Sequence, residues 1–159
     1  MIKLIVALFS LSMSAFAQEV TYRQSISGEL LGLGFGPSVQ YDYMFKHSAR
    51  GFYDVRIGVG RHGFSSDYSG ITLPHAMIYN FKKKHHFFEL GVGGTLAHDY
   101  HKESASSSTT EYFLGPMIGH RSISPKGFQF RIYLYTFFAK DGSIFPLPGI
   151  GFGKVFRKK

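Results

Sequence analysis

The chain has 159 residues, enough for one domain, and no cysteine, which excludes disulfides, thiolate metal sites and cysteine nucleophiles. Aromatic residues (all Phe or Tyr) make up 17%, glycine occurs 19 times and only 18% of residues are charged, a balance that excludes a disordered chain and does not fit a helical bundle. The formal net charge is +8, but no nucleic-acid-binding motif accompanies it, so no nucleic-acid partner is expected.

The first segment has the anatomy of a secretory signal peptide. Lys3 supplies a positive charge, an apolar run follows from Leu4 to Phe9, and Ala15-Phe16-Ala17 forms a small-x-small cleavage site. The run is too short and too rich in serine for a transmembrane helix. The sequence therefore predicts a cleaved signal peptide at 1–17 and a single domain at 18–159.

The rest of the chain alternates between apolar and polar residues. In the segment from Phe52, the side chains of Tyr53, Val55 and Ile57 fall on one face, and those of Asp54 and Arg56 on the other. Such alternation is typical of a strand between two unlike environments, because successive side chains point to opposite faces. Eight segments follow this pattern: 21–33, 37–46, 52–63, 71–81, 87–98, 111–122, 128–139 and 145–156.

The number and length of these segments favour a membrane barrel. Most contain about ten residues, the length of a tilted strand that crosses a bilayer. Short basic connectors (46–51, 82–86, 124–127) alternate with mostly longer ones (61–70, 98–110, 140–143), and a tight loop occupies 32–36. A soluble sandwich or a lipocalin-like barrel would also have alternating strands, but with the apolar face inside. We therefore predict an all-β fold: an eight-stranded antiparallel up-and-down transmembrane β-barrel in a bacterial outer membrane, with both termini periplasmic and no helix in the mature chain.

Several stretches carry a family resemblance. Glu29-Leu30-Leu31-Gly32 precedes Ser38-Val39-Gln40-Tyr41-Asp42-Tyr43, and Lys83-Lys84-His85-His86-Phe87-Phe88-Glu89-Leu90-Gly91-Val92-Gly93 and Pro125-Lys126-Gly127-Phe128-Gln129-Phe130-Arg131 follow. From about Gly28 to Phe156 the chain resembles a family of small, largely uncharacterised outer-membrane β-barrel proteins common in Bacteroidetes-type bacteria. The resemblance implies the fold and carries over no activity, ligand or catalytic residue. It also leads us to expect an aliphatic residue where His75 stands.

The inward face of the predicted barrel carries charges of both signs. We expect a polar network in the lumen, made by Glu29, Gln40, Asp42, Asp54, Arg56, Glu89, Arg121, Gln129, Arg131 and Tyr133. The interior of an eight-stranded barrel is just wide enough for side chains to fill it, and buried charges must be paired. A packed polar core is therefore the first interpretation, and a narrow ion channel is the alternative.

The last strand and the short turns concern the membrane. Ile150, Phe152 and Phe156 alternate on one face, a pattern that resembles the signal read by the outer-membrane insertion machinery, although Lys154 interrupts it. Lysines and arginines gather in the short turns and at the C-terminus, where we expect contact with anionic outer-membrane lipids. These residues leave open a surface or periplasmic protein partner and do not specify it.

Two histidine motifs could carry chemistry. His98-Asp99-Tyr100-His101, in the predicted loop 98–110, offers too few ligands for zinc, which needs three or four in fixed geometry. His120-Arg121-Ser122 resembles the His-x-Ser of lipid A deacylases, but no carboxylate lies nearby to orient the histidine. We predict no cofactor, no metal and no enzymatic activity, and a structural or surface-interaction role through loops 61–70 and 98–110.

Overall fold

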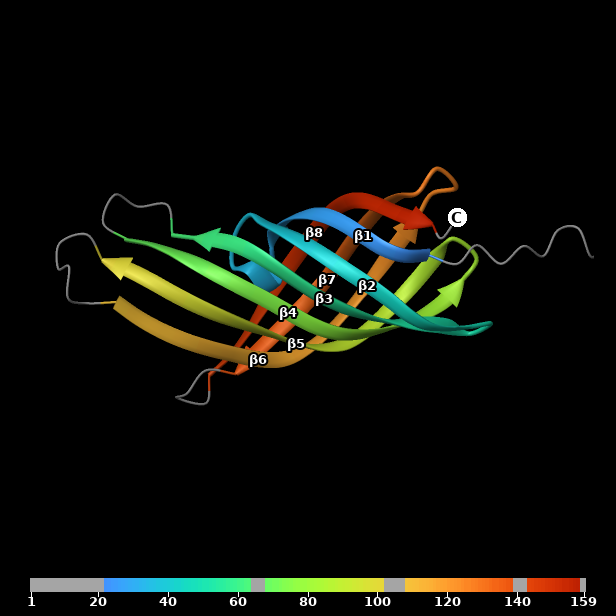
Figure 1. Cartoon of the computed structure of the whole chain (residues 1–159). Coiled ribbons are helices and arrows are strands. Elements are labelled where there is room, and N and C mark those ends of the chain that lie inside the picture. The colour runs from blue at the N-terminus through green and yellow to red at the C-terminus, as the bar shows by residue number, and fades with distance from the viewer. Residues whose placement is uncertain (1–21, 64–67, 102–107, 139–142, 158–159) are drawn as a thin grey trace, which may run out of the picture.

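The computed structural model describes residues 22–63, 68–101, 108–138 and 143–157. The predicted signal peptide at 1–17 lies outside these residues. Eight antiparallel strands close into a barrel, each pairing with the next and the last with the first (Figure 1). The strands are β1 (Tyr22–Leu31), β2 (Ser38–Ser48), β3 (Gly51–His62), β4 (Tyr68–Lys83), β5 (His86–His101), β6 (Ser108–Ile123), β7 (Phe128–Phe138) and β8 (Ile144–Arg157). The predicted fold class and strand order are confirmed.

The predicted strand bounds need correction around β4, β5 and β6, which have 16 residues each. The predicted fifth strand ends at His98 and leaves Asp99 to His101 in a loop, but these residues belong to β5, and Tyr100 pairs with Ser108 of β6. The alternation fades there because the side chains are polar on both faces. Strand pairing continues regardless, since it depends on backbone hydrogen bonds and not on side-chain hydrophobicity.

The two faces of the barrel have opposite character. On β3 the outward side chains of Val55, Ile57 and Val59 are 40%, 58% and 53% exposed, whereas the inward Asp54 and Arg56 are fully buried. This apolar-out arrangement contradicts the soluble alternatives, which would bury the apolar face. Closing the sheet also gives every strand a hydrogen-bonded neighbour on both sides, as a hydrocarbon environment requires.

An aromatic belt runs round the outside near the end where the short turns lie, which we call the turn end. It crosses β2 to β5 through ring contacts between Tyr43, Phe45, Tyr53, Tyr79, Phe81 and Phe88. Centroid distances within it include 4.6 Å for Tyr53–Tyr79 and 4.5 Å for Tyr79–Phe81. Such belts lie at the membrane–water interface of transmembrane barrels. The described chain begins and ends at this same end (Figure 1).

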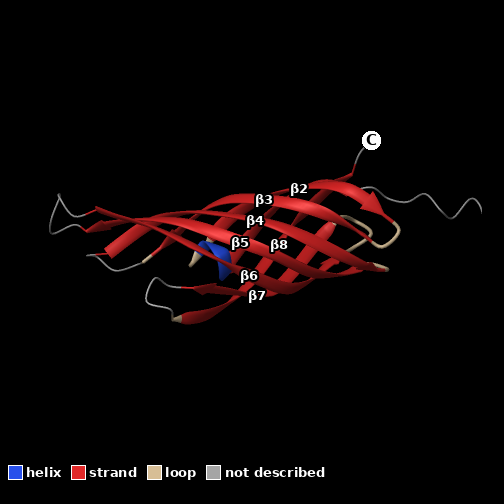
Figure 2. Cartoon of the chain, turned by 90° about the horizontal axis from the view of Figure 1, so that it is seen from below, coloured by secondary structure: helices blue, strands red, loops and turns tan. Residues whose placement is uncertain are grey.

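A short helix corrects the predicted first strand, which was extended to residue 33. The chain leaves β1 at Leu31 with a positive φ of 59°, and a 3-10 turn, η1 (Gly32–Gly34), folds into the barrel (Figure 2). Leu33 is fully buried there. Its N–H donates to the Tyr133 hydroxyl (2.9 Å), and the Thr95 hydroxyl donates to its carbonyl (2.5 Å). Among the described residues, no helix is long and apolar enough to cross a membrane.

His75 faces outward with its polar atoms satisfied. The β3–β4 register runs without a shift through Ile57↔His75, so this residue does not mark a register change. Its Nε2 lies 2.9 Å from the Tyr112 hydroxyl and the two rings stack at 5.6 Å. Gly94 of the intervening β5 makes this contact possible, because a Cβ there would lie 2.7 Å from Nε2 of His75 and 2.5 Å from the hydroxyl.

Candidate functional site

The barrel interior is arranged in three layers along its axis. Nearest the turn end is the lower apolar cluster: Met44, Phe52, Phe87, Ile123 and Val155. Two residues further along four of the same strands come Asp42, Asp54, Glu89 and Arg121. Together with Arg56 of β3, Glu29 of β1 and Arg131 of β7, they form the ionic layer. Above it lies the upper apolar cluster of Leu33, Ala76, Ile78, Met117, Tyr133 and Tyr135. The period of two in each strand produces this layering, because every second residue points inward.

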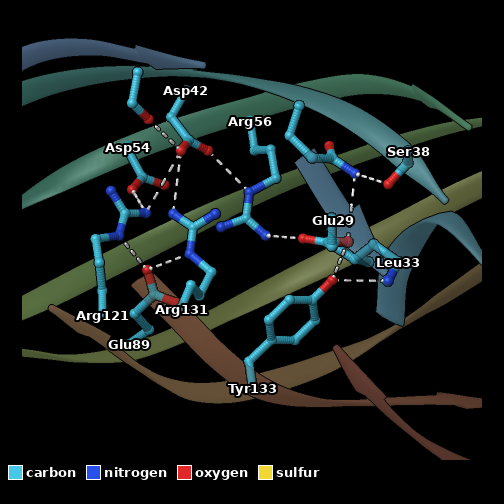
Figure 3. Close-up of polar contacts among 12 residues, drawn as sticks. Glu29, Leu33, Ser38, Asp42, Asp54, Arg56, Glu89, Arg121, Arg131 and Tyr133 are labelled. Carbon is cyan, nitrogen blue, oxygen red and sulfur yellow. Dashed lines mark hydrogen bonds and ion pairs between the residues drawn. The ribbon is translucent and has the colours of Figure 1, made fainter. Parts of the chain in front are cut away.

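The ionic layer holds four carboxylates and three guanidinium groups, all at most 3% exposed. Asp42 lies at its centre, with Oδ1 2.9 Å from Nε of Arg56 and Oδ2 3.1 Å from Nη2 of Arg131 (Figure 3). Arg56 also approaches Glu29, at 3.7 Å. These pairs connect residues from strands β1, β2, β3 and β7 across the lumen.

Arg121 makes the shortest contacts of the layer. Its Nη2 lies 2.5 Å from Oδ2 of Asp54, and its Nε lies 2.6 Å from Oε1 of Glu89. The same Glu89 oxygen accepts a hydrogen bond from Nε of Arg131 at 3.1 Å. Burying charged pairs at this depth costs their hydration, and the layer offsets part of that cost by sharing each carboxylate among several donors.

Neutral side chains complete the network. Tyr133 donates to Glu29 (2.5 Å) and Gln40 lies 3.4 Å from the same oxygen. Gln129 donates to Ser25 (3.2 Å), which in turn donates to Asp42 (2.7 Å). The structure thus brings together all ten residues named from the sequence: Glu29, Gln40, Asp42, Asp54, Arg56, Glu89, Arg121, Gln129, Arg131 and Tyr133.

The sequence reasoning missed three members of the network: Ser25, Ser38 and Asn80. Ser38 accepts a hydrogen bond from Gln40 at 2.9 Å (Figure 3). Ser25 links Gln129 to Asp42, and Asn80 donates to Asp54 at 3.0 Å. Asn80 could have been found, because it is in phase with the inward residues Ala76 and Ile78 of β4. Ser25 could have been found only by extending the weaker alternation of β1.

The three residues of the predicted insertion signal lie on the outer face of β8. Ile150, Phe152 and Phe156 are 39%, 62% and 46% exposed. The interrupting Lys154 turns toward the turn end, where its Nζ lies 4.4 Å from the Phe128 ring centroid and donates to a backbone carbonyl. The role of Ile150, Phe152 and Phe156 in insertion stays a prediction.

The histidine motifs do not converge on a catalytic or metal site in the described residues. His98 faces outward with Nδ1 2.7 Å from the Thr110 hydroxyl, while the next residue, Asp99, faces inward and pairs with His62. His120 stacks on His86 at 5.2 Å on the outer surface. Across residues 22–63, 68–101, 108–138 and 143–157, no group of three His, Asp or Glu side chains is placed to hold a metal.

Comparison with known proteins supports the fold alone. No protein-family model matches the chain, and a search of curated proteins finds no match. Among solved structures, the N-terminal β-barrel domain of OprF from Pseudomonas aeruginosa is similar, with a TM-score of 0.65, 13% identity and coverage of 87% of this chain and 100% of that one.

Two further outer-membrane barrels are also similar. Neisserial surface protein A has a TM-score of 0.53 and 12% identity, covering 85% of this chain and 94% of its own. Ail, the attachment invasion locus protein of Yersinia pestis, solved with the heparin analogue sucrose octasulfate, has a TM-score of 0.51 and 14% identity, covering 86% of this chain and 100% of its own. The chain therefore has the fold of the small eight-stranded outer-membrane β-barrels.

Proposed function

We propose that this protein is a closed, non-enzymatic barrel of a bacterial outer membrane, with a structural or surface-interaction role. The observation that carries the proposal is the sealing of the ionic layer between the lower and upper apolar clusters. Conduction needs a continuous hydrated path, whereas the ionic side chains here are at most 3% exposed and are paired with one another. Filling by side chains is also what the diameter of an eight-stranded barrel favours.

The distribution of charge supports one orientation in the membrane. The turn end carries basic residues in its turns: Lys46, Arg50, Lys82, Lys83, Lys84 and Lys126. The described acidic residues lie either in the ionic layer or, for Asp99 and Glu111, near the opposite end. A surface of this sign is attracted to anionic phospholipid headgroups. We therefore place the turn end, with both termini, on the periplasmic side.

The opposite end, which we call the loop end, would then face the cell exterior. Strands β4, β5 and β6 extend furthest on this side (Figure 1). Two of the similar barrels are described as an attachment invasion protein and a surface protein, which supports a surface role without specifying it. We infer that any partner would be contacted through segments 61–70 and 98–110. No cofactor is needed for such a role.

Single-channel recording in a planar bilayer tests the closure. We expect no discrete current steps from purified protein, with folding and insertion verified in the same preparation by the mobility shift on heating and by protease protection. Reproducible steps would contradict the closed lumen and favour the channel alternative. An Asp42→Asn variant would then locate the path, because a current through the lumen would change its ion selectivity and a leak around the barrel would not.

A further inference from the structure

A pocket of about 290 Å³ opens at the loop end of the barrel, above η1. The lining comes from Phe35, His62, Gly63, Ala97, Asp99, Glu111, Phe113 and Phe137. Apart from Gly63, which follows β3, these residues belong to the η1 cap and to strands β3, β5, β6 and β7, so the pocket lies in the barrel mouth and not on its lipid-facing side. Barrel mouths are among the common positions of small-molecule sites.

The floor of the pocket is a group of three half-buried phenylalanine rings. Phe35 meets Phe113 edge-on, with centroids 5.1 Å apart, and meets Phe137 at 5.3 Å. Phe113 and Phe137 are themselves 5.1 Å apart. Phe35 holds its position through a left-handed φ of 55° and a hydrogen bond from its N–H to the Gly32 carbonyl (3.1 Å). The floor thus consists of Phe35, which η1 holds in place, and two strand residues, Phe113 of β6 and Phe137 of β7.

The charged side of the pocket is carboxylate-rich. Nε2 of His62 lies 2.8 Å from Oδ1 of Asp99, and the two side chains are only 12% and 15% exposed. Gly70 makes room for this pair, because a Cβ there would lie 2.3 Å from the imidazole and 2.6 Å from the carboxylate. Glu111 of β6 adds a second carboxylate to the lining. Among the described residues that line the pocket, two are carboxylates and one is an imidazole.

We propose that this pocket binds a small organic cation of quaternary-ammonium type. Aromatic ring faces attract such cations through the ring quadrupole, and carboxylates attract them by charge, while the methyl groups suit an apolar floor. An anion would be repelled, and a strongly hydrated metal ion would gain nothing from the phenylalanine rings. The proposal goes beyond the proposed function and is independent of it, because the pocket lies above the upper apolar cluster whether or not the lumen conducts.

The test uses choline as the probe and the Ala97 methyl group as the reporter. The protein, labelled with ¹³C at alanine methyl groups and folded in maltoside micelles, is titrated with choline and separately with 3,3-dimethylbutan-1-ol, an uncharged molecule of the same shape. Ala76 in the upper apolar cluster and Ala49 at the turn end serve as internal controls. We expect a saturable shift at Ala97 and none at Ala76 or Ala49, with choline binding roughly 3- to 30-fold more tightly than the alcohol.

Substitutions separate charge recognition from simple filling of the pocket. Asp99→Asn combined with Glu111→Gln should weaken choline binding by roughly tenfold or more. Tyr100→Phe is the matched control on β5, since Tyr100 neighbours Asp99 but faces outward, and it should leave binding unchanged. An unchanged Ala76 signal verifies that each variant is folded. Equal affinity for choline and the alcohol, no saturation at Ala97, or full binding by the double variant would overturn the proposal.

Discussion

Replacing Arg121 by leucine tests whether charge pairing holds the ionic layer together. Arg121 is the one described cation within ion-pair distance of Asp54, at 2.5 Å, and the other direct contact of this carboxylate is the Asn80 amide. Its removal leaves Asp54 fully buried without a counter-charge. Breaking a buried pair in this way costs about 3–5 kcal/mol. We expect the free energy of unfolding of Arg121→Leu to fall by that amount.

Arg131→Leu is the matched comparison. It removes a guanidinium of equal size from the same layer, but Asp42 keeps Arg56 at 2.9 Å and Glu89 keeps Arg121 at 2.6 Å. Every carboxylate thus retains a cation, and the loss is limited to charge-assisted hydrogen bonds, about 1.5–3 kcal/mol. Ion pairing therefore predicts a larger loss of stability for Arg121→Leu than for Arg131→Leu, whereas a general loss of buried volume would affect the two variants equally.

A second substitution should rescue the first. Changing Asp54 to Asn in the Arg121→Leu background removes the orphaned charge, and we expect it to restore at least ~1.5 kcal/mol. Should Arg121→Leu fail to fold, Arg121→Lys keeps the charge without the guanidinium geometry and should be intermediate in stability.

Urea titration in micelles or phospholipid vesicles measures these differences. Far-UV circular dichroism is the suitable signal, because the chain has no tryptophan. Unfolding midpoints are comparable provided that the dependence on urea is the same in each variant. Equal midpoints for Arg121→Leu and Arg131→Leu, or no rescue by the second substitution, would refute the idea that ion pairing sets the stability of the layer.

Three further predictions concern single positions. Tyr133→Phe removes the hydroxyl that joins Glu29 to the Leu33 N–H, so the free energy of unfolding in urea should fall by about 1–3 kcal/mol. The amide hydrogen of Leu33 should also exchange faster, which a purely local effect at Glu29 would not produce. Gly115→Ala should destabilise the barrel strongly, because its Cβ would lie 1.7 Å from a carbonyl oxygen of β7. Gly28→Ala is the control: a Cβ there would have nothing within 4 Å, so stability should change by less than ~0.5 kcal/mol. Equal effects of the two substitutions would contradict the close approach of β6 and β7 at Gly115. Phe156→Ala should slow assembly into liposomes that contain the purified insertion machinery, while the equilibrium unfolding midpoint stays nearly unchanged. An unaltered assembly rate would show that Phe156 is not part of the insertion signal.

The alternation of the sequence identified the residues of the candidate site but not which of them pair. The ten lumen residues were identifiable because each falls on the inward side of an alternating strand, as Asp54 and Arg56 do on either side of the outward Val55. Their partners were not identifiable. Asp54 is bound by Arg121, 67 residues away, because strand tilt and register bring β3 and β6 to the same level across the lumen.

The pocket at the loop end could not be predicted from the alternation of apolar and polar residues. His62, Asp99 and Phe113 lie on different strands, and two of these positions were expected in loops or at strand ends. Phe35 reaches the pocket through η1, which replaces the expected end of the first strand. Nothing in the local sequence distinguishes this inward fold from an ordinary tight loop.

The sequence by itself determined the number and order of the strands, the apolar exterior and the charged interior. These features follow from a period of two, which each strand expresses through its own residues without reference to its neighbours. The tertiary structure decided which charges pair, that apolar clusters seal them on both sides, and that η1 turns Leu33 into the lumen. Those outcomes depend on closure, because the eight strands define a common interior, with a fixed tilt and register, only when β8 pairs with β1.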